Sequence, residues 1–152
     1  MRTNFSGNLS FPCLIRDAMQ SEKYRFLEHT ADILFEAYGK SYEEAFQNSA
    51  HAMFSVFGKA GEGERASFSV SAHNIEELTV QALADMLAYM DTHEMVFSSV
   101  QVTAFDAGKK HIEFTAFGEK KQPRDSVKAV TYHELMVKED KGGWIIRILL
   151  DV

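Results

Sequence analysis

Two stretches of the chain carry apolar residues at three- and four-residue spacings, the period of one face of a helix. Ser41 followed three residues later by Glu44 is a capping box, so the first helix is predicted at residues 41–57. Asn74, with Glu77 at the third helical position, predicts the start of the second. The apolar positions of the two helices are Tyr42, Ala45, Phe46, Ala50, Met53, Phe54 and Phe57, then Ile75, Leu78, Ala82, Leu83, Met86, Leu87 and Met90.

Strand patterns occupy most of the remaining chain. Phe68, Val70 and Ala72 alternate with serines, as expected of a half-buried strand. Further strand-like runs lie at residues 24–28, 33–38, 96–105, 111–117, 130–138 and 144–150. Two helices among about seven strands, with the late strands consecutive, predict an α+β fold. We expect both amphipathic helices to pack on a mixed, largely antiparallel sheet system.

The chain of 152 residues, 45% of them hydrophobic, is long enough for one domain with a core. Residues 1–22 show neither the helical nor the strand period, so they are predicted to be a loosely ordered N-terminal extension. The domain is predicted to span residues 23–152.

Charge and cysteine content narrow the possible partners and compartment. A net charge of −6 argues against a broad phosphate-binding surface, so any RNA is expected to be held only indirectly. Cys13 is the only cysteine, which fits a reducing cytoplasm. No run approaches the roughly 20 apolar residues needed to cross a bilayer. We therefore expect a cytoplasmic protein with no membrane partner.

Carboxylates at strand ends are the strongest candidates for chemistry, because a hard cation needs several oxygen ligands converging on one point. Asp32 lies in the bend between the first two predicted strands. Asp151 closes the last strand, and the terminal carboxylate of Val152 follows it. The competing interpretations are an Asx turn or cap for Asp32 and a solvated tail for Asp151.

Three further residues are weaker candidates. Asp85 falls about 20° outside the apolar arc of the second helix, where an ordinary boundary aspartate is the alternative. His29 and His133 flank strand-like segments and could meet, although each could equally be a structural histidine. The six histidines show no zinc-ligand spacing, and Cys13 is a poor nucleophile candidate.

Three motifs, in this order, resemble the archease family over residues 24–152. They are Tyr24-Arg-Phe-Leu-Glu-His-Thr-Ala-Asp32, Ala37-Tyr-Gly-Lys-Ser-Tyr-Glu-Glu-Ala-Phe46 and Lys128-Ala-Val-Thr-Tyr-His133, followed by an acidic residue beside the C-terminus. Archeases assist the GTP-dependent RNA-splicing ligase, promoting guanylylation of its histidine and multiple turnover in tRNA exon ligation. The resemblance implies the same role here, for a protein that is not itself an enzyme.

The resemblance also implies a divalent cation held by Asp32 and Asp151, with the Val152 carboxylate completing the site. Calcium, magnesium and manganese all suit oxygen ligands. Asp85 stands where the family usually has a glutamate within a Trp-Leu-x-Glu-Leu-like pattern, and the tryptophan is missing here. Lys128 could contact a phosphate or an acidic patch of the ligase.

Two other functions stay open at this point. One is a stand-alone metal-dependent phosphodiesterase or hydrolase, in which Asp32, Asp151 and His29 or His133 hold a metal that activates water. The other is a chaperone-like module for RNA-modifying enzymes.

Overall fold

The computed structural model describes residues 22–123 and 127–152. Within them, seven strands and two helices follow one another: β1 (Tyr24–Leu27), β2 (Ile33–Gly39), α2 (Tyr42–Val56), β3 (Glu64–Ser71), α3 (Ile75–His93), β4 (Met95–Asp106), β5 (His111–Lys120), β6 (Ala129–Asp140) and β7 (Gly143–Asp151). The predicted extension lies, apart from Glu22, outside the described residues. None of the described helices is long and apolar enough to cross a membrane.

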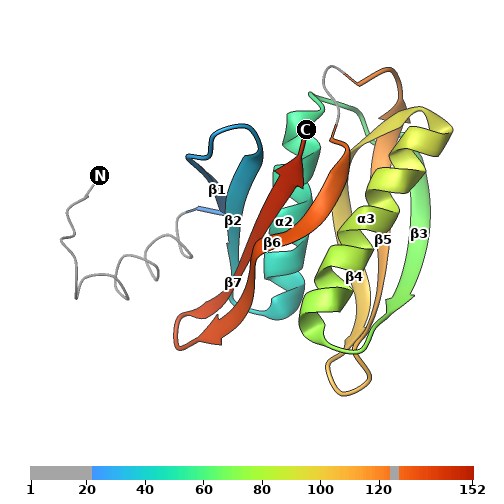
Figure 1. The fold of residues 1–152 in the computed structure, drawn as a ribbon. Coiled ribbons are helices and arrows are strands. Elements are labelled where there is room, and N and C mark those ends of the chain that lie inside the picture. The colour runs from blue at the N-terminus through green and yellow to red at the C-terminus, as the bar shows by residue number, and fades with distance from the viewer. Residues whose placement is uncertain (1–21, 124–126) are drawn as a thin grey trace.

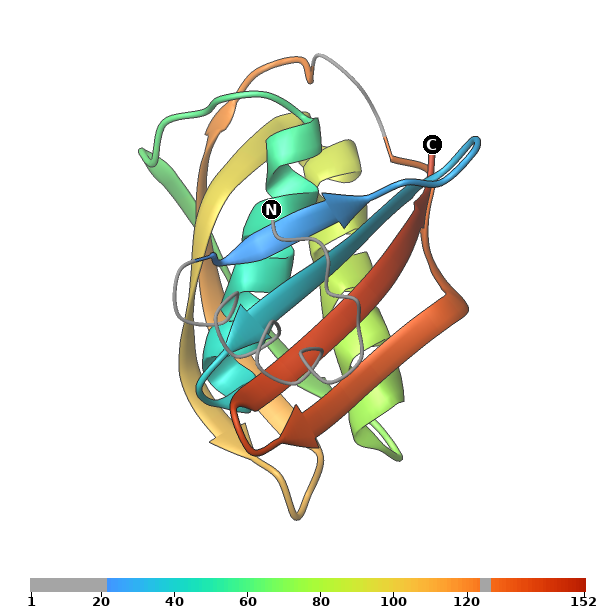
Figure 2. The same ribbon diagram turned by 90° about the vertical axis from the view of Figure 1, so that its left-hand side faces the viewer.

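The two helices lie between two sheets, which gives the domain three layers (Figures 1 and 2). The first sheet has the strand order β1-β2-β7-β6, and the second sheet has the order β3-β5-β4. In Figure 2 the first sheet faces the viewer and the helices lie behind it. The α+β prediction, with two helices and seven strands, is confirmed.

Every strand pair among the described residues is antiparallel, where the sequence predicted a mixed, largely antiparallel sheet system. The reason is topological. Helix α2 carries the chain from the first sheet to the second, so it joins no two strands of one sheet. Strands β3 and β4 flank α3 and run parallel to each other, but β5 lies between them and pairs antiparallel with both.

The helix starts follow the predicted caps. The Ser41 hydroxyl accepts a hydrogen bond from the Glu44 N–H at 3.1 Å, and the Asn74 side chain accepts one from the Glu77 N–H at 2.7 Å. Glu94 caps the C-terminal end of α3: it adopts a left-handed conformation with φ 51° and donates its N–H to the Met90 carbonyl. The chain enters β4 at the next residue.

Aromatic side chains join the helices to the second sheet. The ring of Phe46 in α2 lies 5.2 Å from that of Phe114 in β5, and Phe54 lies 5.6 Å from Phe97 in β4. Phe54 is only 2% exposed, which confirms the predicted apolar face of the first helix. On the other side of α2, the fully buried Phe35 of β2 extends the same core into the first sheet.

Candidate metal site at one end of the first sheet

The register of the β2–β7 pair brings two of the predicted ligands to one end of the first sheet. Ile33, the first residue of β2, lies opposite Leu150 of β7. Asp32 precedes Ile33 and Asp151 follows Leu150, so the two aspartates come next to each other where the antiparallel pair ends. Leu150 is fully buried, and its neighbour Asp151 therefore projects from the face turned away from the helices.

The start of β6 holds the main chain at Asp151. Ala129 lies opposite Asp151, and the Lys128 N–H donates a hydrogen bond of 2.7 Å to the Asp151 carbonyl oxygen. Lys128 itself is exposed, and Val152 is 39% exposed. In Figure 2 the C-terminus lies beside the bend that joins β1 to β2. Asp32, Asp151, Val152 and Lys128 thus share one end of the sheet.

An ion pair ties β2 to β7 farther along the same strands. Arg147 donates two hydrogen bonds, of 3.0 and 2.7 Å, to one carboxylate oxygen of Glu36, and these residues are register partners. The Glu36 side chain is 16% exposed and that of Arg147 is 33% exposed, so solvent screens the pair only in part. This contact helps to hold the register that aligns Asp32 with Asp151.

The bend before β2 is also attached to β6. Nε2 of His29 lies 3.3 Å from a carboxylate oxygen of Glu134. His133 is exposed, and its N–H donates to the Thr131 hydroxyl at 3.3 Å. The structure thus pairs His29 with the residue after His133. Glu134 was not predicted, because it lies where the β6–β7 register shifts and its φ is 56°, and neither feature has a sequence signal.

The side chain of Asp85 forms a hydrogen bond within its own helix. Its carboxylate accepts a hydrogen bond of 3.0 Å from the side-chain amide of Gln81, one turn earlier in α3. That contact is the one expected of an aspartate at the edge of a solvated helix face.

The metal prediction rests on a small set of oxygen donors. Within residues 22–123 and 127–152, no three His, Cys, Asp or Glu side chains are grouped so that they could hold one metal ion. Neither Asp85 nor a histidine therefore adds a third side chain to Asp32 and Asp151. The third donor that the sequence predicted is the Val152 carboxylate. An all-oxygen set fits calcium, magnesium or manganese better than zinc. Cation binding stays a prediction.

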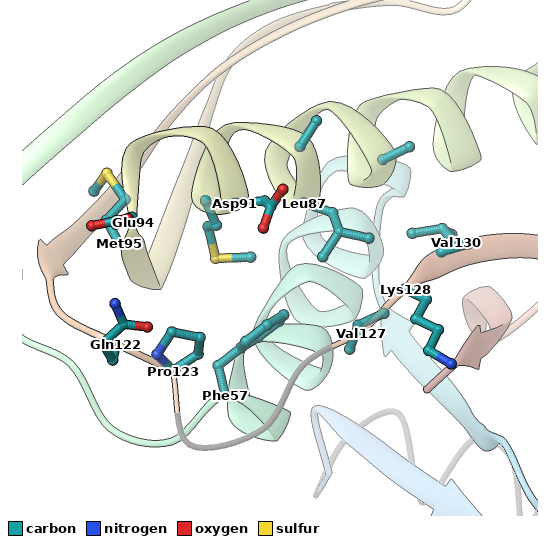
Figure 3. Close-up of a pocket in the computed structure, with 14 residues that line it drawn as sticks. Phe57, Leu87, Asp91, Glu94, Met95, Gln122, Pro123, Val127, Lys128 and Val130 are labelled. Atoms are coloured by element: carbon teal, nitrogen blue, oxygen red, sulfur yellow. The ribbon is translucent and has the colours of Figure 1, made fainter.

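Two hollows border this end of the sheet. Asp32 borders a shallow one of about 420 Å³ between the β1–β2 bend and the end of α2. Lys128 lines a larger one of about 750 Å³ between α3 and the start of β6 (Figure 3). The candidate site therefore has an apolar pocket directly beside it.

Comparison with known proteins identifies the family. A model of the archease protein family matches residues 24–152, which is nearly all of the described chain. The chain belongs to the archease family. An archease of Methanosarcina mazei is 38% identical over 144 residues, covering 88% of this chain and 98% of its own. An archease of Sulfurisphaera tokodaii is 34% identical, covering 86% and 99%.

Two solved structures have the same fold as this chain. The solution structure of Methanobacterium thermoautotrophicum protein 1598 superposes with a TM-score of 0.71 at 29% identity, covering 86% of this chain and 99% of its own. The crystal structure of a Thermotoga maritima archease, described as a possible chaperone, has a TM-score of 0.62 at 20% identity. The second likeness bears on the fold alone.

Proposed function

We propose that this protein activates a GTP-dependent RNA ligase, promoting guanylylation of the ligase histidine and repeated turnover in tRNA exon ligation. The observation that carries the proposal is the alignment of Asp32 with Asp151 at the end of the β2–β7 pair, in a chain of the archease family. Sequence resemblance assigns a divalent cation to these two positions, and the strand register supports a shared site.

The chain's own residues bind and present the cation. Asp32 and Asp151 supply carboxylate oxygens, and the Val152 carboxylate is the third donor. The Lys128 N–H on the β6 side holds the Asp151 main chain where it lies next to Asp32. The exposed Lys128 side chain is left to contact a phosphate or an acidic patch of the ligase.

A bound divalent cation supplies positive charge that offsets the repulsion between a protein of net charge −6 and the phosphates of GTP. The proposal leaves phosphoryl transfer to the ligase. This protein acts as a binding partner of the ligase.

The test is a guanylylation and ligation assay with the cognate ligase, GTP and RNA ends. Substoichiometric amounts of the wild-type protein are expected to accelerate guanylylation and to convert a single turnover into many. Asp32→Asn and Asp151→Asn are expected to abolish the acceleration. Asp140→Asn is the matched control, because Asp140 lies at the opposite end of the same sheet, in the β6–β7 turn.

The other outcomes separate the alternatives. RNA or phosphodiester turnover without the ligase would make the protein a hydrolase in its own right. Activation that survives both aspartate substitutions would favour a chaperone-like role without a metal. Residues appended after Val152 turn its carboxylate into an amide, so they are expected to weaken activation, whereas the same residues appended before Met1 are not.

A further inference from the structure

The pocket beside Lys128 has an apolar floor. It lies between the last turns of α3 and the segment that leads into β6 (Figure 3). Phe57 at the end of α2, Val127 and Val130 form the floor, and all three are buried. Leu87 and Ala88 of α3 form one wall, where Leu87 is half-buried and Ala88 is exposed. Leu87 thus packs against the core and also borders an open hollow.

The rim of the pocket is charged unevenly. Asp91 and Glu94 border it from the C-terminal end of α3, and Lys128 borders it from the β6 side (Figure 3). Among the described residues, neither carboxylate forms an ion pair. The C-terminal end of a helix adds partial negative charge through its last carbonyl groups. One end of an apolar pocket is therefore electronegative and suits a cationic group.

The pocket is also joined to the candidate metal site by the backbone. Lys128 lines the pocket, and its N–H is bonded to the Asp151 carbonyl oxygen at 2.7 Å. A group seated in the pocket would therefore lie one strand away from the Asp151 carboxylate. Docking there would fix the orientation of the metal site relative to whatever is docked.

We propose that this pocket is the docking site for an apolar side chain of the protein partner, with a neighbouring lysine or arginine placed against Asp91 and Glu94. The inference rests on the proposed function, and it names the surface through which the ligase is held. A volume of about 750 Å³ admits a bulky side chain and part of its flanking segment. A nucleotide fits poorly, because its phosphates would meet two carboxylates. Apolar anchors in pockets with charged rims are typical of interface hot spots.

A substitution that fills the pocket tests whether an apolar side chain of the partner docks there. Ala88→Trp adds an indole to an exposed wall position, so the fold should tolerate it. Ala104→Trp is the matched control on an exposed position of β4, in the other sheet. We expect Ala88→Trp to weaken binding to the purified ligase by about tenfold or more, measured by biolayer interferometry, and Ala104→Trp to leave it unchanged. Calcium affinity, measured by calorimetry, should stay at the wild-type value in both variants.

Neutralising Asp91 and Glu94 on the rim tests whether a lysine or arginine of the partner lies against them. The double variant Asp91→Asn with Glu94→Gln should bind the ligase severalfold more weakly and lose part of the salt dependence of the association rate. The control double variant, Glu43→Gln with Glu76→Gln, removes two first-turn carboxylates remote from the pocket. Tighter binding by the rim variant would show that the partner's flanking residue is acidic and would overturn this part.

The outcomes separate the two proposals. If wild-type protein binds and activates the ligase and Ala88→Trp does so equally well, the docking site is wrong and the proposed function stands. If wild-type protein neither binds nor activates the ligase, the proposed function fails and the docking site fails with it. A small molecule that co-purifies with wild-type protein and is lost in Ala88→Trp, seen by native mass spectrometry, would replace the protein side chain as the occupant.

Discussion

The two sheets are built alike on the side that faces the helices and differ on the side that faces away. The outer face of the second sheet carries a polar cluster: the Ser71 hydroxyl lies 2.6 Å from Nδ1 of His111, and Nε2 of His111 lies 3.0 Å from the Glu113 carboxylate. The first sheet carries the Glu36–Arg147 ion pair along β2 and β7, and Asp32 and Asp151 meet at one end of it. Both sheets thus hold titratable groups in proximity.

The difference between them is what surrounds these groups. The serine, histidine and glutamate of the second sheet satisfy one another, and none of them lines the pocket beside Lys128 or the one beside Asp32. In the first sheet, by contrast, Asp32 lines one hollow, and Lys128, whose N–H is bonded to the Asp151 carbonyl oxygen, lines the other. A serine–histidine–glutamate contact alone is therefore weaker evidence of function than two carboxylates next to a pocket. On this comparison, we expect the second sheet to be a scaffold and the first sheet to carry the function.

The largest effect is expected from Phe46, because it belongs to the core that both sheets share. Its side chain is fully buried and its ring contacts Phe114 of the second sheet. Phe46→Ala should lower the free energy of unfolding by about 3 to 5 kcal/mol. Chemical denaturation should show one transition for both sheets. Two separate transitions would mean that the sheets are not coupled through the helices.

A smaller loss is expected from the ion pair of the first sheet. Glu36→Ala removes the carboxylate and leaves the half-buried Arg147 guanidinium without its partner. We expect a loss of about 1 to 2 kcal/mol, since the pair is partly screened by solvent. Urea denaturation measures it. If Glu36→Ala were as stable as wild type, the pair would not contribute to the β2–β7 register.

His51 of α2 should make stability depend on pH. Burial, and next the charge of Lys23, hold the pKa of this imidazole below the usual 6.5, and its Nε2 is buried without a hydrogen-bond partner in the described structure. Between the lowered pKa and 6.5 the unfolded chain binds more protons than the folded one, so stability is full above pH 6.5 and falls as the pH drops below it. Thermal unfolding of His51→Leu should show a shallower decline than wild type below pH 6.5, and equal declines would contradict the assignment.

The smallest effect is expected from the polar cluster of the second sheet. Ser71→Ala and Glu113→Ala change exposed side chains and should each alter the free energy of unfolding by about 0.5 kcal/mol or less. Neither should change activation of the ligase. Loss of activation in a stably folded Ser71→Ala protein would break the comparison, because it would move function to the second sheet.

Local features of the fold could be predicted from the sequence. Ser41 and Asn74 marked the helix starts because a capping side chain acts within three residues of its own position. The buried face containing Phe54 followed from helical periodicity. The strand partners could not be predicted, since the pairing of β2 with β7 joins residues more than a hundred positions apart.

The candidate site, like the fold, could be predicted from the sequence only in part. Asp32 and Asp151 were singled out because they stand at strand ends, but their alignment depends on the long-range register of β2 and β7. Glu134 was missed because a bulge in β6 brings it to His29, and bulges leave no periodic signal. The pocket beside Lys128 was also not predicted, because Leu87 fits the core pattern of its helix and only the packing leaves it half-buried.

Calcium titration calorimetry of four purified proteins tests the central claim most directly. Wild type and Asp140→Asn are expected to bind one cation per chain, and Asp32→Asn and Asp151→Asn are each expected to lose that binding while keeping the thermal stability of the fold. Unchanged cation affinity in both Asp32→Asn and Asp151→Asn would contradict a shared site at the end of the β2–β7 pair.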